Sequence, residues 1–301
     1  MADLTDADVK EMAGFLAGAC AEVKRWVPEP EWRPGWQSEA AAERGNQERG
    51  PAGPWGEDPV RGVYTAAALY LEAVLQCMRA LAASLTTDTT HYVPYCLARA
   101  AMEAGSQAHW LLEPGIGARR RVARLILLRA SGARHRAEEA RKTGSAASAS
   151  HGETPEQAAQ LAASLGLECQ YRPLGPYRGE WRCEGDKLPG YTERNRALEQ
   201  AMLTPGAYSI YSAALHAEWH AVTSAWEEVT LPEGTRALVL RPDRIAVWGA
   251  VLICAAPAVV PAARALQLLD HRARSREVGL WVTSTLDLMR RMDLPREWWR
   301  D

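Results

Sequence analysis

Residues 60–85 have the sequence VRGVYTAAALYLEAVLQCMRALAASL, in which apolar side chains recur at intervals of three and four residues. This spacing places them on one face of an α-helix, and such a face is buried when it packs against other helices. We therefore expect a long core helix from Val60 to Leu85. Its apolar face consists of Tyr64, Ala67, Leu71, Val74, Leu75, Met78 and Leu81.

The same spacing extends outward from this helix over most of the chain. Pro94 suits the first turn of the next helix, and the Glu-Pro-Gly sequence at 113–115 ends it. The Thr-Pro-Glu-Gln sequence at 154–157 is a capping box with proline at the first helical position. The expected helices cover residues 1–25, 94–112, 116–142, 154–165, 191–203, 206–229, 242–270 and 275–292.

Sheet is expected to be almost absent, because the one strand-like run is the short segment Arg236 to Leu240. Two long segments rich in proline and glycine, residues 26–59 and 166–190, are expected to be loops. The sequence thus predicts an all-α protein, a bundle of about seven or eight helices. We expect an N-terminal helix and a Pro- and Trp-rich loop at 1–59, and a bundle domain at 60–301 with a loop insertion near 143–190.

The composition is that of an ordinary globular protein. The 301 residues are 47% hydrophobic and 24% charged, with a net charge of -2, which excludes collagen-like and disordered chains. We find no nucleotide-binding loop, no zinc-finger spacing and no nucleophile elbow in the sequence. Residues 245–263 carry no charge, but they are rich in Ala and include Pro257 and Pro261. A buried helix is therefore expected there rather than a membrane span.

Six cysteines are scattered along the chain without a C-x-x-C pair. The N-terminal sequence MADLTDADVK is acidic and polar, unlike a secretory signal. We therefore expect reduced thiols and a cytoplasmic location. The six are Cys20, Cys77, Cys96, Cys169, Cys183 and Cys254.

The segment 206–229 carries the most informative polar pattern. Its apolar side chains form one seam, and a polar stripe with the same spacing runs beside it. In this stripe His216 and His220 stand one helical turn apart, so His216 is a candidate acid/base residue. A metal held by both histidines, or an ordinary structural role for each, is the alternative. The stripe consists of Ser209, Ser212, His216, His220 and Thr223, and Tyr208 and Tyr211 begin the seam.

A second polar stripe lies on the helix expected at 94–112. Arg99 and Glu103 are four residues apart, and Ser106 and Trp110 continue their stripe. A carboxylate buried between helices needs a partner or a shifted pKa. The pair is therefore either a tether between helices or part of the lining of a pocket.

The helix expected at 116–142 is strongly basic, with nine Arg or Lys residues against two Glu residues. A face with this charge attracts phosphate groups, so nucleic-acid binding through Arg121 and Arg124 is one hypothesis. The alternative is a solvated face whose arginines pair with acidic neighbours.

Three blocks of sequence stand out beside these patterns. They are Leu97-Ala-Arg99-Ala-Ala-Met-Glu103 with Trp110-Leu-Leu-Glu-Pro-Gly-Ile116, then Arg121-Val-Ala-Arg124, and finally Tyr208-Ser-Ile-Tyr-Ser212-Ala-Ala-Leu-His216. Together they resemble a group of all-helical actinobacterial proteins to which no activity is assigned. The resemblance extends over roughly residues 60–290 and implies a helical fold.

That group is similar in turn to HEPN-type helical domains, some of which are metal-independent ribonucleases with a closely spaced Arg and His on one helix. In this chain Ser209 occupies the position at which such an Arg would precede His216, so this segment lacks the Arg–His pair. Arg129 and His135 have the required spacing on the basic helix. The resemblance therefore implies RNA binding or RNA cleavage as an alternative function.

The hypothesis that we favour is a small-molecule-binding bundle with a polar pocket between its helices. In this pocket His216 would transfer a proton, Glu103 would fix its tautomer, and Arg99 would hold an anionic group of the ligand. Such a protein would be an acid/base enzyme of specialised metabolism that uses no cofactor. The other expected pocket residues are Ser212, His220, Tyr208, Trp110 and Arg124.

Two further functions remain open at this point. One is the nucleic-acid-binding or RNA-cleaving protein already described, and the other is a structural or regulatory helical module without a site. Apolar seams on Ala-rich helices are also compatible with a homodimer. No membrane partner is expected.

Overall fold

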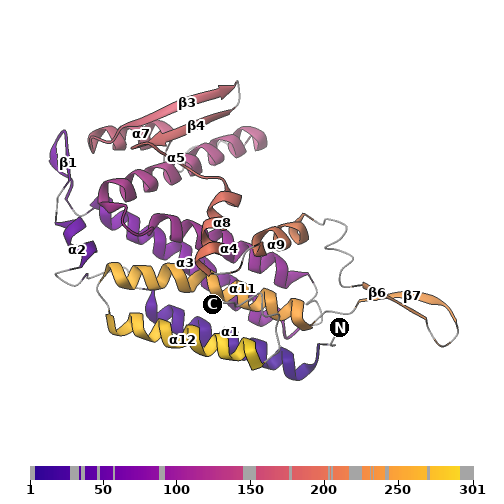
Figure 1. Ribbon diagram of the computed structural model, residues 1–301. Helices are drawn as coiled ribbons and strands as arrows, with labels where there is room; N and C mark the ends of the chain where they lie inside the picture. The colour runs from indigo at the N-terminus through magenta and orange to yellow at the C-terminus, as the bar shows by residue number, and fades with distance from the viewer. Residues whose placement is uncertain are drawn as a thin grey trace.

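The helices expected from the sequence lie side by side in a bundle (Figure 1). The computed structural model describes residues 4–27, 34, 38–45, 48–56, 58–87, 92–144, 154–175, 178–202, 204, 206–216, 226–230, 232, 234–240, 244–269 and 272–291. Within them, the helical bundle predicted from the sequence is confirmed.

Six long helices make up most of the bundle. They are α1 (Asp6–Trp26), α3 (Asp58–Ser84), α4 (Val93–Leu111), α5 (Gly117–Thr143), α11 (Arg244–Leu268) and α12 (Arg272–Arg291). Shorter helices are α2 (Glu39–Arg44), α7 (Pro155–Ser164), α8 (Tyr191–Met202) and α9 (Ala207–Leu215). The capping box expected at Thr154 begins α7 and satisfies two of its free backbone N–H groups.

The apolar face of α3 lies at the centre of the core. Every side chain of the predicted face is buried, from Tyr64 near its start to Leu81 near its end. Helix α3 packs against α1, α4, α5 and α11, so this face contacts neighbours on several sides. Burying one such aliphatic side chain contributes about 1.5 to 3 kcal/mol. Helix α1 also packs on α11, and the division of the chain at residue 59 stays a prediction.

Helices α4 and α11 come closest where Gly105 meets Pro257. A Cβ atom at position 105 would lie 2.5 Å from the Pro257 Cβ and 2.6 Å from its carbonyl oxygen, so a side chain does not fit there. Pro257 and Pro261 both lie inside α11. The close approach sets the position of α4 along α11.

The uncharged run at 245–263 belongs to α11. By length and composition, α3 and α11 are the two helices in the described residues that are apolar enough to cross a membrane. The apolar window of α11 is 78% buried inside the protein, which fits a core helix.

The segment 166–190 is not a loop, in contrast to the sequence-based expectation. Strands β3 (Cys169–Gly175), β4 (Arg178–Cys183) and β5 (Asp186–Lys187) form an antiparallel sheet beside α5 and α7 (Figure 1). Glu184 and Gly185 join β4 to β5, and both have positive φ, 52° and 78°, as a type I′ hairpin turn requires. The other expected loop contains α2 and a short hairpin of β1 (Arg49–Gly50) and β2 (Gly53–Pro54).

The prediction of one continuous helix over 206–229 is also wrong. Helix α9 ends at Leu215, and β6 (Trp226–Thr230) pairs antiparallel with β7 (Arg236–Leu240). The strand expected at 236–240 is thus confirmed. The register pairs Trp226 with Leu240 and Val229 with Ala237. β-branched residues such as Val229 favour a strand, although the sequence pattern indicated a helix. This hairpin projects from the bundle in Figure 1.

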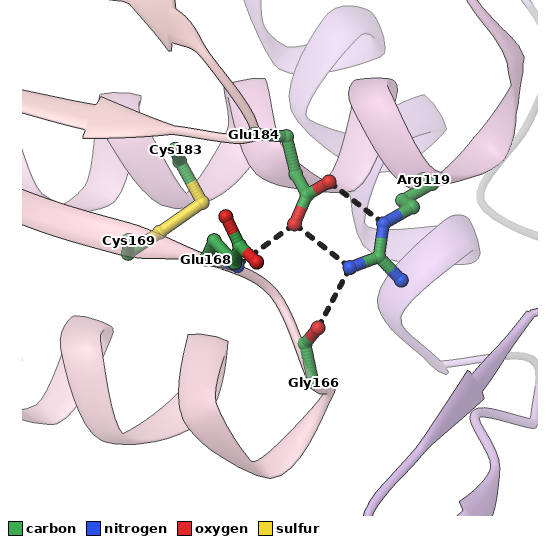
Figure 2. The surroundings of a disulfide bond; sticks show 6 residues. All are labelled: Arg119, Gly166, Glu168, Cys169, Cys183 and Glu184. Atoms are coloured by element: carbon green, nitrogen blue, oxygen red, sulfur yellow. Dashed lines mark hydrogen bonds and ion pairs between the residues drawn. A yellow bond between two sulfur atoms is a disulfide. The ribbon is translucent and has the colours of Figure 1, made fainter.

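Cys169 and Cys183 form a disulfide, so the expectation of reduced thiols is wrong for this pair (Figure 2). The two residues are opposite each other in the β3–β4 ladder, which brings their Cα atoms to 4.1 Å. This proximity follows from a strand pairing that the scattered positions in the sequence did not indicate. Cys183 is fully buried, whereas Cys169 is half-buried. The free cysteines are Cys20, Cys77, Cys96 and Cys254.

Candidate functional site

A cavity of about 600 Å³ lies where the end of α4 meets α5, α8 and the β4–β5 hairpin. We call it the α4–α8 cavity. Its wall combines aromatic, cationic and acidic side chains from segments that are far apart in the sequence. They include His109 and Trp110 from α4, Arg124 from α5, Asp186 and Lys187 from β5, and Arg194 from α8.

Arg124 lies in the cavity wall and is held in place by several bonds. Its Nη1 donates to the backbone carbonyl of Trp110 and lies 2.5 Å from a Glu113 carboxylate oxygen. Its Nε donates to Asp186 at 2.9 Å, and its guanidinium lies 4.9 Å from the centre of the Trp110 ring. With its side chain only 4% exposed, Arg124 is held in place by two carboxylates and an indole ring.

Asp186 joins the hairpin to α5. Arg120 and Arg124 both donate to its carboxylate, Arg120 at 2.6 and 2.7 Å. Burial alone would raise the pKa of Asp186, but the hydrogen bonds from these two arginines outweigh it and hold the pKa below its ordinary value. Asp186 is therefore charged at neutral pH and fastens the cavity wall.

Arg194 differs from Arg124 in its bonding partners. It is 5% exposed, and no carboxylate forms an ion pair with it among the residues that the structure describes. Its guanidinium donates to the Pro189 carbonyl and lies 4.7 Å from the Tyr191 ring centre, while its Nε is buried without a hydrogen-bond partner. Burial lowers the pKa of Arg194, although an arginine stays protonated in proteins. The cavity wall thus contains a buried cation without a paired carboxylate.

His109 supplies a titratable group between these arginines. It is half-buried, and burial lowers its pKa more than nearby Glu113 raises it, with Arg124 lowering it further. A histidine with a lowered pKa is a neutral imidazole at neutral pH, which can accept a proton.

A second polar cluster lies further along α4, where the sequence predicted a site. Arg99 Nε donates to Glu103 at 2.8 Å, and the Tyr208 hydroxyl donates to the same carboxylate oxygen at 3.1 Å. The Arg99 guanidinium lies 5.5 Å from the Tyr208 ring centre, and its Nη1 is buried without a hydrogen-bond partner. We call Arg99, Glu103 and Tyr208 the Arg99 cluster. It links α4 to α9, and Glu103 is also within electrostatic reach of Arg194.

His216, the proposed acid/base residue, is not part of either cluster. His216 is exposed in the turn that follows α9, because the helix ends at Leu215 instead of continuing to residue 229. Ser212 is half-buried on α9, one helical turn after Tyr208. His220 lies outside the described residues. The residues expected in one pocket thus lie in two places. Arg99, Glu103 and Tyr208 are in contact in one, and Trp110 and Arg124 are in contact in the other.

Arg121 and Arg124, through which nucleic-acid binding was one hypothesis, are both buried. Arg121 is 0% exposed and donates to Glu43 at 3.0 Å and to Glu39 at 2.9 Å, both on α2. Tyr64 donates to the same Glu43 at 2.6 Å. Arg121 and Arg124 therefore pair with acidic neighbours, as the alternative for the basic helix expected, but they do so inside the protein and not on a solvated face. Arg129 and His135 are exposed on α5.

His109, Asp186 and Arg194 were not among the site residues expected from the sequence. His109 directly precedes Trp110 at the C-terminal end of the stripe on α4, and this position was the one available signal. Among the described residues, no group of three or more His, Cys, Asp or Glu side chains is arranged to hold a metal ion. Comparisons with protein-family models, curated proteins and solved structures found no match.

Proposed function

We propose that this protein binds a small polar organic molecule in the α4–α8 cavity. The observation that carries the proposal is the cavity itself, with Arg194, His109 and Trp110 in its wall. Its volume of about 600 Å³ falls within the range of about 300 to 1,000 Å³ that is typical of ligand pockets. Ligand sites in helical bundles commonly form between facing helices, as here between α4 and α8.

The chemistry of the wall favours a ligand with an anionic group. A buried cation without a paired carboxylate is costly, and an oxyanion of the ligand would supply the missing counter-charge at Arg194. Arg124 is already paired with Asp186 and Glu113, so it serves to hold the wall. Trp110 adds apolar surface for the body of the ligand.

Proton transfer is the reaction type that the cavity supports. In this proposal the neutral imidazole of His109 takes a proton from the bound ligand, while Arg194 orients the ligand. This assigns to His109 the role that the sequence suggested for His216. The Arg99 cluster would support Arg194 from α4 rather than contact the ligand.

A pair of tryptophan substitutions on α8 tests the proposal. Ala197 lines the cavity and is exposed, so Ala197→Trp should fill the cavity without disturbing the core. Ala201→Trp is the matched control, because Ala201 is exposed on the same helix outside the cavity wall. Each protein is incubated with the small-metabolite fraction of a cell extract and analysed by native mass spectrometry.

We expect a bound small molecule in the wild-type and Ala201→Trp proteins and none in Ala197→Trp. The proposal would be overturned by a bound molecule that persists in Ala197→Trp, or by its absence from the wild-type protein. His109→Gln separates binding from chemistry: we expect it to keep the bound molecule and to abolish any turnover of it.

A further inference from the structure

The β4–β5 hairpin that closes one side of the α4–α8 cavity is fastened by the Cys169–Cys183 disulfide (Figure 2). We propose that the redox state of this disulfide regulates ligand binding, with the oxidised form binding and the reduced form binding weakly. This inference rests on the proposed function, because it concerns the same cavity. It adds regulation of ligand binding, which the fold and the cavity alone would not require.

The disulfide lies next to the turn that joins β4 to β5. Cys183 is the last residue of β4, and the turn residues Glu184 and Gly185 follow it directly. Four residues of this short segment line the cavity, on both sides of Cys183. They are Arg182, Gly185, Asp186 and Lys187.

Besides the bonds of Asp186 to Arg120 and Arg124, the contacts of Glu184 hold the turn, and its backbone N–H donates to the Glu168 carbonyl at 2.9 Å. Glu184 accepts two hydrogen bonds from Arg119 at 2.8 Å and one from the backbone N–H of Glu168 at 2.7 Å (Figure 2). Arg119 also donates to the carbonyl of Gly166. These bonds are partly exposed to solvent, and the Arg119 side chain is 35% exposed, so water competes with them.

The turn contains a residue in an uncommon backbone conformation. Glu184 has a φ of 52°, a left-handed conformation that residues other than glycine rarely adopt. Such a conformation persists only where the surrounding structure enforces it. The disulfide pins the residue immediately before Glu184 to β3, and its loss would allow the turn to relax and Asp186 to leave Arg124.

The two sulfur atoms differ in exposure to solvent, and this difference determines which of them a reductant attacks first. Cys183 is fully buried and Cys169 is half-buried, so a thiolate of a dithiol reductant attacks the Cys169 sulfur. The S–S bond breaks, Cys183 leaves as a thiolate and takes up a proton, and a mixed disulfide forms at Cys169. The second thiol of the reductant then displaces Cys169 as a thiol. Two electrons and two protons pass to the protein, and the reductant becomes a cyclic disulfide.

The test uses naphthalenesulfonate as the probe, since it combines an aromatic body with an oxyanion. Its affinity is measured by isothermal titration calorimetry in the oxidised protein and after treatment with dithiothreitol. If the ordered hairpin falls to about a tenth of the population on reduction, the apparent dissociation constant rises about tenfold. The variant in which Cys169→Ser and Cys183→Ser are combined should bind weakly with or without dithiothreitol.

A second measurement follows the hairpin without any ligand. Hydrogen exchange at the amides of Glu184, which donates to the Glu168 carbonyl, and of Asp186 should be slow in the oxidised protein and faster after reduction, whereas exchange in α3 should not change. The four free cysteines do not complicate the result, because the double serine variant retains all of them.

The outcomes separate this inference from the proposed function. If the probe fails to bind the oxidised wild-type protein, or still binds Ala197→Trp, the cavity is not the ligand site and both proposals fail. If the probe binds oxidised, reduced and double serine proteins equally, and the hairpin exchanges equally in all three, ligand binding stands and redox control is rejected.

Discussion

The guanidinium of Arg124 lies 4.9 Å from the ring centre of Trp110 and also donates a hydrogen bond to the backbone carbonyl of the same residue. One side chain of α5 thus contacts both the ring and the main chain at the C-terminal end of α4. The same guanidinium binds Asp186 of β5. Three elements are joined at this point, and the wall of the α4–α8 cavity depends on it.

Removal of the Arg124 charge should destabilise the whole protein. Arg124→Met leaves Asp186 and Glu113 with fewer partners, so we expect the free energy of unfolding to fall by about 3 to 5 kcal/mol. Arg79→Met is the control, since the Arg79–Glu72 pair on α3 is exposed and should cost about 0 to 1 kcal/mol. Urea unfolding followed by circular dichroism measures both. Equal losses in the two variants would show that the buried position of Arg124 adds nothing.

The α4–α11 contact predicts opposite effects for two glycine substitutions. Gly105→Ala places a Cβ against Pro257 and should lower the free energy of unfolding by about 1 to 3 kcal/mol. Gly18→Ala, in the exposed middle of α1 with no atom within 4 Å of the new Cβ, should raise it by about 0.5 to 1 kcal/mol. Thermal unfolding of both variants measures these changes. An unchanged free energy of unfolding in Gly105→Ala would mean that α4 and α11 separate easily.

Acid should weaken the contact between the hairpin and α5. The pKa of Asp186 is lower in the folded protein than its ordinary value of 3.8, because its bonds to Arg120 and Arg124 outweigh the effect of burial. Its contribution to stability is therefore complete above pH 3.8 and is lost as the pH falls below that value toward the folded pKa. The free energy of unfolding of the wild-type protein should fall over this range. Asp186→Asn should show a smaller change between about pH 5 and pH 3.

His109 should titrate below its ordinary pKa of 6.5, because burial disfavours the charged imidazole. A folded pKa below the unfolded one means that the neutral form is favoured by folding, so this contribution to stability is present above pH 6.5 and declines as the pH falls below it. Nuclear magnetic resonance titration of the histidine ring protons measures the pKa, with His109→Gln assigning the signal. A midpoint at or above 6.5 would remove the basis for a neutral imidazole in the cavity.

Local spacing was enough to predict the helices that form the core. The seven apolar positions of α3 are all buried, because a helix with one apolar face is stable in water only when that face packs against other elements. The same spacing is misleading over 206–229, because it runs without a break from Tyr208 and Tyr211 of α9 to Trp226 of β6. A spacing of three and four residues does not reveal where one element ends and another begins.

The candidate site was only partly predictable for a different reason. Arg99 and Glu103 lie on one helix, so their spacing alone indicated their contact. Arg124 and Asp186 are 62 residues apart, and Arg121 and Glu43 are 78 apart, so their pairing depends on how α2 and the hairpin dock on α5. No local pattern encodes that docking. The disulfide was missed for the same reason, since it depends on the register of β3 and β4.

The position where Gly105 meets Pro257 has a consequence for how binding specificity could change. Because a side chain does not fit there, the α4 side of the cavity is tied to the core and tolerates few alterations. The β4–β5 side is a short surface hairpin, and its exposed lining residues Arg182 and Lys187 can be exchanged without repacking any helix. New ligand preferences would therefore arise most readily through the hairpin, which makes it the natural place to begin directed evolution of this protein.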